Sequence, residues 1–203
     1  MNTELIKTKS KYYYSAAVKK LILTQFGSTI MAIMISMPTA TSPEDGVLST
    51  GANILSITTT VLALMFFFYI QYTAMWDIAA KDKLAIDGNR MIKDENIGLK
   101  ASLLANIPTY AFAMLCIIFR AIFLLTEANA IGLCSDITYA IELIWNYMYH
   151  GFLVLIVPSM DSYLSLLYFA SFALFTIPSL ICCLIAYRMG LKGKRIFPEK
   201  KKY

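Results

Sequence analysis

Four polar side chains recur at every fourth residue in the second half of the chain: Thr138, Glu142, Asn146 and His150. Residues at this spacing lie along one face of an α-helix. Glu142 and His150 are ionisable, and ionisable groups at membrane depth often mark the path of an ion, a proton or a substrate. The alternative interpretation is an amphipathic helix at the membrane surface whose polar face contacts lipid headgroups.

Other polar residues interrupt the long apolar stretches. Gln25 shares a helical face with Ser28 and Thr29, and we expect that face to point into a helix bundle. Asn106 lies in a later apolar stretch, and Arg120 is the one basic residue inside such a stretch. The candidate substrate or ion path therefore comprises Gln25, Asn106, Arg120, Glu142, Asn146 and His150.

Two prolines occupy matching positions near the ends of apolar stretches. Pro108 follows the basic Lys100 by eight residues, and Pro178 precedes Arg188 by ten. Both therefore lie roughly 12–15 Å inside the same membrane boundary. Because proline removes a backbone hydrogen bond and bends a helix, we predict a pair of kinks that act as a hinge or shape a cavity.

The composition indicates a membrane protein. Hydrophobic residues make up 58% of the 203 residues and charged residues only 15%, whereas soluble domains are about one-quarter charged. We expect residues 1–203 to form a single membrane domain. The four cysteines give no disulfide framework, and no metal site or cofactor is expected, because His and Cys do not occur at ligand spacing.

The basic residues predict the topology. Seventeen of the 18 Lys and Arg residues fall within residues 7–20, 81–100 and 188–202. Such clusters stay in the cytoplasm, where they contact anionic lipid headgroups, and nucleic acid is not an expected partner. We therefore place three segments in the cytoplasm: a basic arm at 1–17, a hairpin loop at 77–100 and a basic tail at 188–203.

The number of membrane crossings follows from this placement. If all three basic segments are cytoplasmic, the chain must cross the membrane an even number of times between one segment and the next. The interval 100–188, however, contains three apolar blocks. Two crossings fit best, because four would leave almost no residues for turns. The prediction is an all-α integral membrane protein with four spans and an outer interfacial or re-entrant helix, and five or six spans are the alternatives. The expected spans are 18–37, 54–76, 100–125 and 163–187.

The segment 127–160, which we expect on the outer side, contains the acidic residues Glu127, Asp136 and Glu142. Arg120 lies near the outer end of the third span, so we expect it to pair with Glu127, Asp136 or Glu142. On the cytoplasmic side, the hairpin carries more mixed charge than a positive loop requires. Its candidate partner-docking residues are Asp77, Lys81, Asp82, Asp87, Arg90 and Asp94.

The chain contains no phosphate-binding glycine loop, HExxH motif or GxSxG motif. We therefore expect a non-enzymatic plasma-membrane protein, acting as a subunit of a transport-associated or other membrane complex. It would work with a protein partner or as a homo-oligomer. One alternative is a stand-alone small-solute carrier or channel that works as an oligomer. The other is a membrane enzyme that uses Glu142 and His150 as acid and base.

Overall fold

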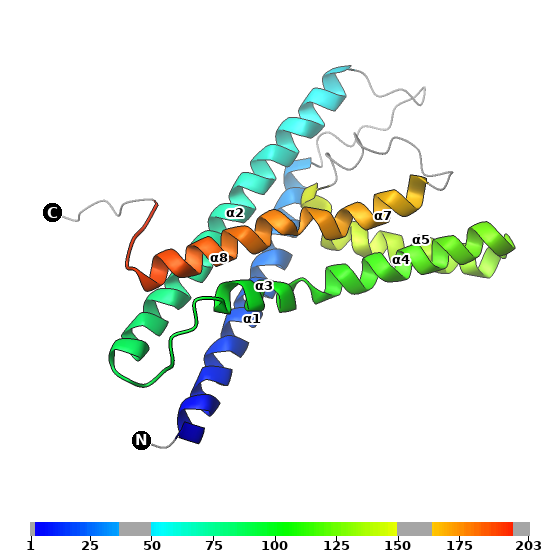
Figure 1. Cartoon of the computed structure of the whole chain (residues 1–203). Coiled ribbons are helices and arrows are strands. Elements are labelled where there is room, and N and C mark those ends of the chain that lie inside the picture. The colour runs from blue at the N-terminus through cyan, green and yellow to red at the C-terminus, as the bar shows by residue number, and fades with distance from the viewer. Residues whose placement is uncertain (1–2, 37–49, 150–163, 197–203) are drawn as a thin grey trace. The chain divides into compact units, whose positions relative to one another are not determined.

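The computed structural model describes residues 3–36, 50–149 and 164–196, and the regular structure within them is helical (Figure 1). This confirms the predicted all-α class. The α-helices are α1 (Thr3–Ser36), α2 (Thr50–Asp87), α3 (Ile97–Ala105), α4 (Ile107–Thr126), α5 (Asn129–Trp145), α7 (Leu164–Phe175) and α8 (Ile177–Leu191), with a 3-10 turn, η2, at Tyr147–Tyr149.

Four stretches of helix are long and apolar enough to cross a membrane. They are Tyr14–Ile35, Ile57–Asp87, Ile107–Thr126 and Phe169–Leu191. Their number and approximate positions agree with the four predicted spans, which is consistent with integration into a membrane. The second stretch continues as helix well past the predicted end at Trp76. α5 has 17 residues and is not among the four.

The chain forms two compact units, each assembled from separate segments. The first unit comprises Met1–Ile22, Tyr69–Ala105 and Pro178–Tyr203, and the second comprises Leu23–Phe68 and Asn106–Ile177. Two of the boundaries between them follow the ends of α3 and α7, close to Pro108 and Pro178. The expectation of one membrane domain over 1–203 stays a prediction.

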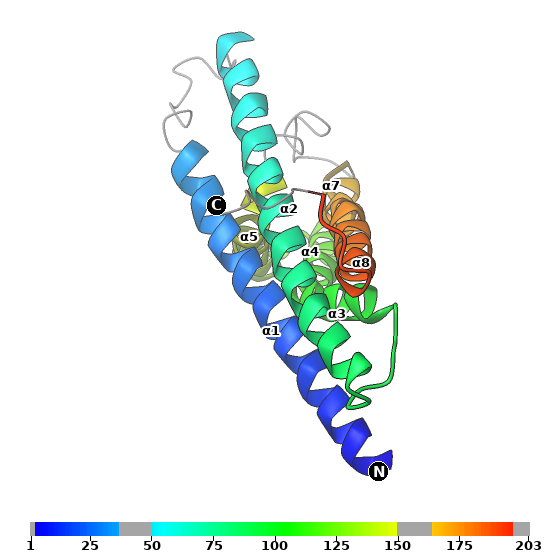
Figure 2. The same cartoon turned by 90° about the vertical axis from the view of Figure 1, so that its left-hand side faces the viewer.

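In the first unit α8 lies beside α2 and α3 (Figure 2), and small residues allow their backbones to pack closely. A Cβ atom added at Gly98 of α3 would lie 2.5 Å from the carbonyl oxygen of Cys183 and 2.7 Å from Cβ of Tyr187. A Cβ atom added at Gly190 of α8 would lie 2.5 Å from Cβ of Ala79. These contacts bring α8 against both α3 and α2, as is typical of helix packing in membranes.

A turn connects α2 to α3 within the segment 77–100 predicted to be a hairpin, and the cytoplasmic location of this segment stays a prediction. α2 ends at Asp87, and the N–H of Arg90 donates to the carbonyl of Ala85 at 2.8 Å across the turn. Before α3, the Asp94 carboxylate accepts the N–H of Asn96 at 2.9 Å and the ammonium of Lys100 at 2.7 Å. The hydrogen bond from Lys100 holds the pKa of Asp94 below its ordinary value.

The described part of the basic tail packs back onto α2. The indole N–H of Trp76 donates to the carbonyl of Lys194 at 2.7 Å, and the guanidinium of Arg195 lies 3.8 Å from the centre of an indole ring of the same tryptophan. The hydroxyl of Tyr72 accepts the N–H of Ile196 at 3.0 Å. A cation stacked on an aromatic ring adds attraction to these hydrogen bonds, so residues 194–196 are held against the helix.

Candidate polar site in the second unit

A tight helical hairpin positions the candidate site. α4 ends at Thr126, and Glu127 adopts a left-handed backbone (φ 53°) while its N–H donates to the carbonyl of Phe123 at 2.8 Å. α5 begins two residues later, so it folds back along α4 (Figure 1). Gly132 of α5 lies against the ring of Phe123, where a Cβ atom would be 2.8 Å from the nearest ring carbon.

The polarity of α5 is inverted relative to a helix that faces water. Its polar residues Ser135, Thr138, Glu142 and Asn146 are at most 8% exposed. Its apolar residues Leu133, Ile137, Ile141 and Ile144 are 43–62% exposed. A helix among headgroups would present its polar face outward. Thr138, Glu142 and Asn146, the described members of the polar stripe, therefore face the interior of the unit, and the outward face suits contact with lipid chains.

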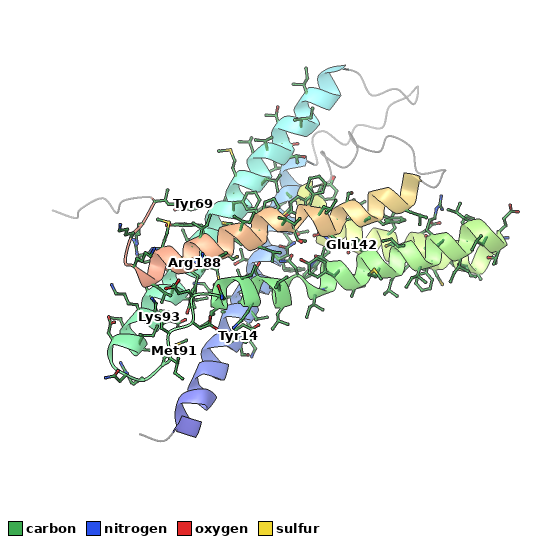
Figure 3. The ribbon with its side chains drawn as sticks, in the orientation of Figure 1. Tyr14, Tyr69, Met91, Lys93, Glu142 and Arg188 are labelled. Atoms are coloured by element: carbon green, nitrogen blue, oxygen red, sulfur yellow. The ribbon has the colours of Figure 1, made fainter. Side chains whose placement is uncertain are left out.

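Asn146 lies at the centre of a buried hydrogen-bond network that includes Glu142, which is labelled in Figure 3. Its side-chain oxygen is 3.4 Å from Nε2 of Gln25 on α1 and 3.4 Å from Oγ1 of Thr109 on α4, and both of these groups donate to it. Its side-chain nitrogen donates to Oε1 of Glu142 at 3.0 Å. The side-chain amide of Asn146 thus connects α1, α4 and α5. The side chains of this network are at most 5% exposed: Gln25, Thr109, Glu142 and Asn146.

Some buried polar atoms around this network have no hydrogen-bond partner within the described residues. They are Oε2 of Glu142, Oγ of Ser28 and Nε1 of Trp145. Thr29, next to Ser28 on α1, donates to the main-chain carbonyl of Trp145 at 2.8 Å. An unpartnered buried polar group costs roughly 1–3 kcal/mol, and more when it is charged. Such groups are therefore candidates for contact with a ligand.

The structure thus brings together three of the six predicted path residues, Gln25, Glu142 and Asn146. The inward orientation predicted for Gln25, Ser28 and Thr29 is confirmed, because all three are buried. Asn106 is also buried, at the break between α3 and α4. His150 lies outside the described residues.

Arg120 stacks on a neighbouring ring of its own helix: its guanidinium carbon lies 5.4 Å from the centre of the Phe123 ring. The expected pairing of Arg120 with Glu127, Asp136 or Glu142 stays a prediction. Sequence reasoning missed Thr109. Its position in the first turn of α4, directly after Pro108, was the available signal, because that turn is where α4 meets the end of α5.

Both prolines lie in the first turn of a helix, just after a break. α3 stops at Ala105 and α4 starts at Ile107, while α7 stops at Phe175 and α8 starts at Ile177. Proline fits a first turn because no helical N–H is needed there. The hydroxyls of Tyr110 and Thr176 are 2.8 Å apart, and Thr176 also donates to the carbonyl of Ala173 at 2.7 Å. The two breaks therefore lie side by side, and a hinge at Pro108 and Pro178 stays a prediction.

Several of the predicted docking residues make contacts inside the first unit. Asp82 is 1% exposed and accepts a hydrogen bond from the hydroxyl of Tyr187 at 2.8 Å, so its side chain is not presented to a partner. Asp77 lies 3.7 Å from the ammonium of Lys20, and Asp94 is bonded to Lys100 as described above. The exposed members of the set are Asp77, Lys81, Asp87 and Arg90.

No protein-family model, curated protein or solved structure matches the chain significantly. The described residues contain no group of three or more His, Cys, Asp or Glu side chains that could hold a metal ion. The functional argument therefore rests on the chemistry of the buried network, which offers an unpartnered carboxyl oxygen, an unpartnered hydroxyl and an amide with its hydrogen bonds formed.

Proposed function

We propose that the chain spans the plasma membrane with both termini in the cytoplasm, and that α5 is a re-entrant helix entering from the outer side. The ring of Tyr139 contacts Phe169 at a centroid distance of 5.7 Å, and the ring of Tyr149 stacks on Phe175 at 5.6 Å. α5 and α7 therefore run in the same direction. The start of α7 therefore lies on the side where α5 begins, which keeps the number of crossings even and the basic tail inside.

This topology predicts different labelling of two introduced cysteines. In a Cys134→Ser background, Glu127→Cys at the exposed α4–α5 turn should react with a membrane-impermeant maleimide added to intact cells. Lys192→Cys, after α8, should react only after the membrane is permeabilised. The Cys134→Ser parent supplies the background from the other cysteines. Equal labelling of both positions in intact cells would indicate an odd number of crossings and contradict the proposal.

We propose further that the protein is a non-enzymatic component of membrane transport, with its solute path in the second unit. The observation that carries this proposal is the inward polar face of α5. Burying a carboxyl group without compensating hydrogen bonds costs free energy in an apolar surrounding. Ionisable groups inside a membrane protein are therefore often functional. Here Glu142 is fully buried and keeps one oxygen unpartnered.

Reconstitution into liposomes tests this function. Proteoliposomes with an imposed potential should take up labelled Na⁺ or Rb⁺, or change their interior pH, faster than empty liposomes. Whichever of these fluxes the wild-type protein supports, Glu142→Gln should slow it by about tenfold or more, and a factor of ten is equivalent to about 1.4 kcal/mol. Glu127→Gln, on the exposed turn of the same hairpin, should leave it unchanged. Transport by this chain is contradicted if the wild-type protein behaves as empty liposomes do.

A complex-forming subunit remains the second candidate because of the hairpin surface. Leu84 and Ile92 are 68% and 60% exposed there, beside the exposed Lys81, Asp87 and Arg90. Apolar side chains rimmed by charge are typical of protein contact sites. A wild-type chain that is silent in liposomes, but that co-purifies with a stoichiometric partner, would favour this second function.

A further inference from the structure

We infer that Glu142 is a proton-binding site: its side chain is a neutral carboxylic acid whose proton can leave and return within the buried network. The inference deepens the proposed transport function by assigning the site to protons, and only the use of that proton in transport rests on the proposed function. The binding of the proton itself follows from burial, hydrogen bonding and the charges around the group.

The hydrogen bonding of Glu142 does not support a negative charge. Its side chain is 0% exposed, and it accepts one side-chain hydrogen bond, from the neutral amide of Asn146 to Oε1. Oε2 accepts none. A buried carboxylate is stable when two or three donors or a cation compensate it. One neutral donor falls short of that, so protonation is the change that removes the uncompensated charge.

The surrounding helices supply polar groups but few charges. α1 contributes Gln25, Ser28 and Thr29, α7 contributes Ser171, and the break after α7 contributes Thr176, all of them neutral. On α4 the titratable groups are Tyr110, Cys116 and Arg120, with Cys116 0% exposed. The hydroxyl of Tyr110 bonds Thr176 and the guanidinium of Arg120 lies over Phe123, whereas Oε2 of Glu142 has no hydrogen-bond donor.

The other described elements of the second unit add no cation. The unit's segment of α2 has no titratable side chain, and the acidic residue of α5 nearest to Glu142 in sequence is the exposed Asp136. In η2, Tyr149 stacks on Phe175. Arg120 is the one basic side chain in the described part of the second unit.

A neutral acid needs an acceptor for its O–H, and Ser28 is the unpartnered hydroxyl among the described residues around this network. Oγ of Ser28 is buried and unpartnered. Ser28 lies on the α1 face that also carries Gln25 and Thr29, and both of these bond the C-terminal end of α5. A hydroxyl can accept one hydrogen bond and donate another. Oγ of Ser28 and Oε2 of Glu142 are both without a partner among the described residues, so they are not bonded to each other, and a proton would pass between them through a bridging water.

An apolar carbodiimide tests the inference without requiring transport. The O–H of a carboxylic acid adds across the C=N bond of this reagent, and the product rearranges to a stable N-acylurea, so the peptide gains the mass of one reagent molecule. In the purified full-length protein in lipid nanodiscs, we expect modification of Glu142 near neutral pH that declines as the pH rises. A charged, water-soluble carbodiimide should leave Glu142 unmodified.

Matched variants make the result specific. Glu142→Gln, which resembles the neutral acid, should fold with an unchanged thermal midpoint and lose the modification, whereas Glu127→Gln should retain it. Absence of label on Glu142 in the folded wild-type protein overturns the inference. Suppression of labelling by Na⁺ at constant pH and ionic strength also overturns it, because a metal cation would then be the occupant. Labelled Glu142 in a protein without flux would contradict the transport function and leave the proton site standing.

Discussion

Gly98→Ala should destabilise the protein, although it adds only one methyl group. The new Cβ atom would lie 2.5 Å from the backbone oxygen of Cys183 and 2.7 Å from Cβ of Tyr187. Neither atom belongs to the flexible end of a side chain, so α3 and α8 must separate. Overpacking of this kind costs about 1–3 kcal/mol, which lowers the thermal midpoint of a chain this long by roughly 2–12 °C.

Gly27→Ala is the matched control for this prediction. Gly27 is also helical, but no atom lies within 4 Å of the position that its Cβ would occupy. Alanine is the better helix former by about 1 kcal/mol, so Gly27→Ala should leave the midpoint unchanged or raise it. The measurement is thermal unfolding of both variants in the same detergent. Equal midpoints would show that α3 and α8 are not packed at glycine distance.

Hydropathy and turn chemistry were sufficient to predict most of the helices. The four spans follow from apolar stretches of about 20 residues, and the hairpin follows from Asp87-Gly88 and the acidic residues before Ile97. These signals are local, because a helix depends on residues within a few positions of one another. The contact of residues 194–196 with Trp76 was not predictable, because it joins residues 118 apart through main-chain groups that every residue carries.

The candidate site was predictable only in part, for a related reason. The four-residue period places Glu142 and Asn146 on one face of a helix, but a period does not reveal what that face contacts. In a soluble protein the polar face of α5 would meet water. Here the apolar face is exposed, and the polar face meets Gln25, 121 residues away, and Thr109, 37 residues away. Such long-range partners leave no periodic signal in the sequence.

Asn146→Leu should be the most destabilising single change in the second unit. Leucine is close to asparagine in shape but lacks its hydrogen bonds. The Nε2 group of Gln25, the hydroxyl of Thr109 and Oε1 of Glu142 would each lose a buried partner. At roughly 1–3 kcal/mol for each unpartnered group, the expected loss is about 3 kcal/mol or more. Thermal unfolding in nanodiscs against Thr138→Val measures it, because Thr138 bonds only within α5, to the carbonyl of Cys134.

A combined variant separates stability from function in this network. If Asn146→Leu is joined by Gln25→Met, Thr109→Val and Glu142→Met, no donor or acceptor of the set remains to be satisfied. Replacing all partners of a buried polar network with apolar groups is often neutral or stabilising. The combined variant should therefore regain most of the stability lost by Asn146→Leu and still show no flux in liposomes. Such a result would mean that the bundle folds without these polar groups, and that transport is the reason for their presence. A combined variant as unstable as Asn146→Leu would show instead that the network holds α1, α4 and α5 together, and the inward polar face of α5 would then be no evidence for a solute path.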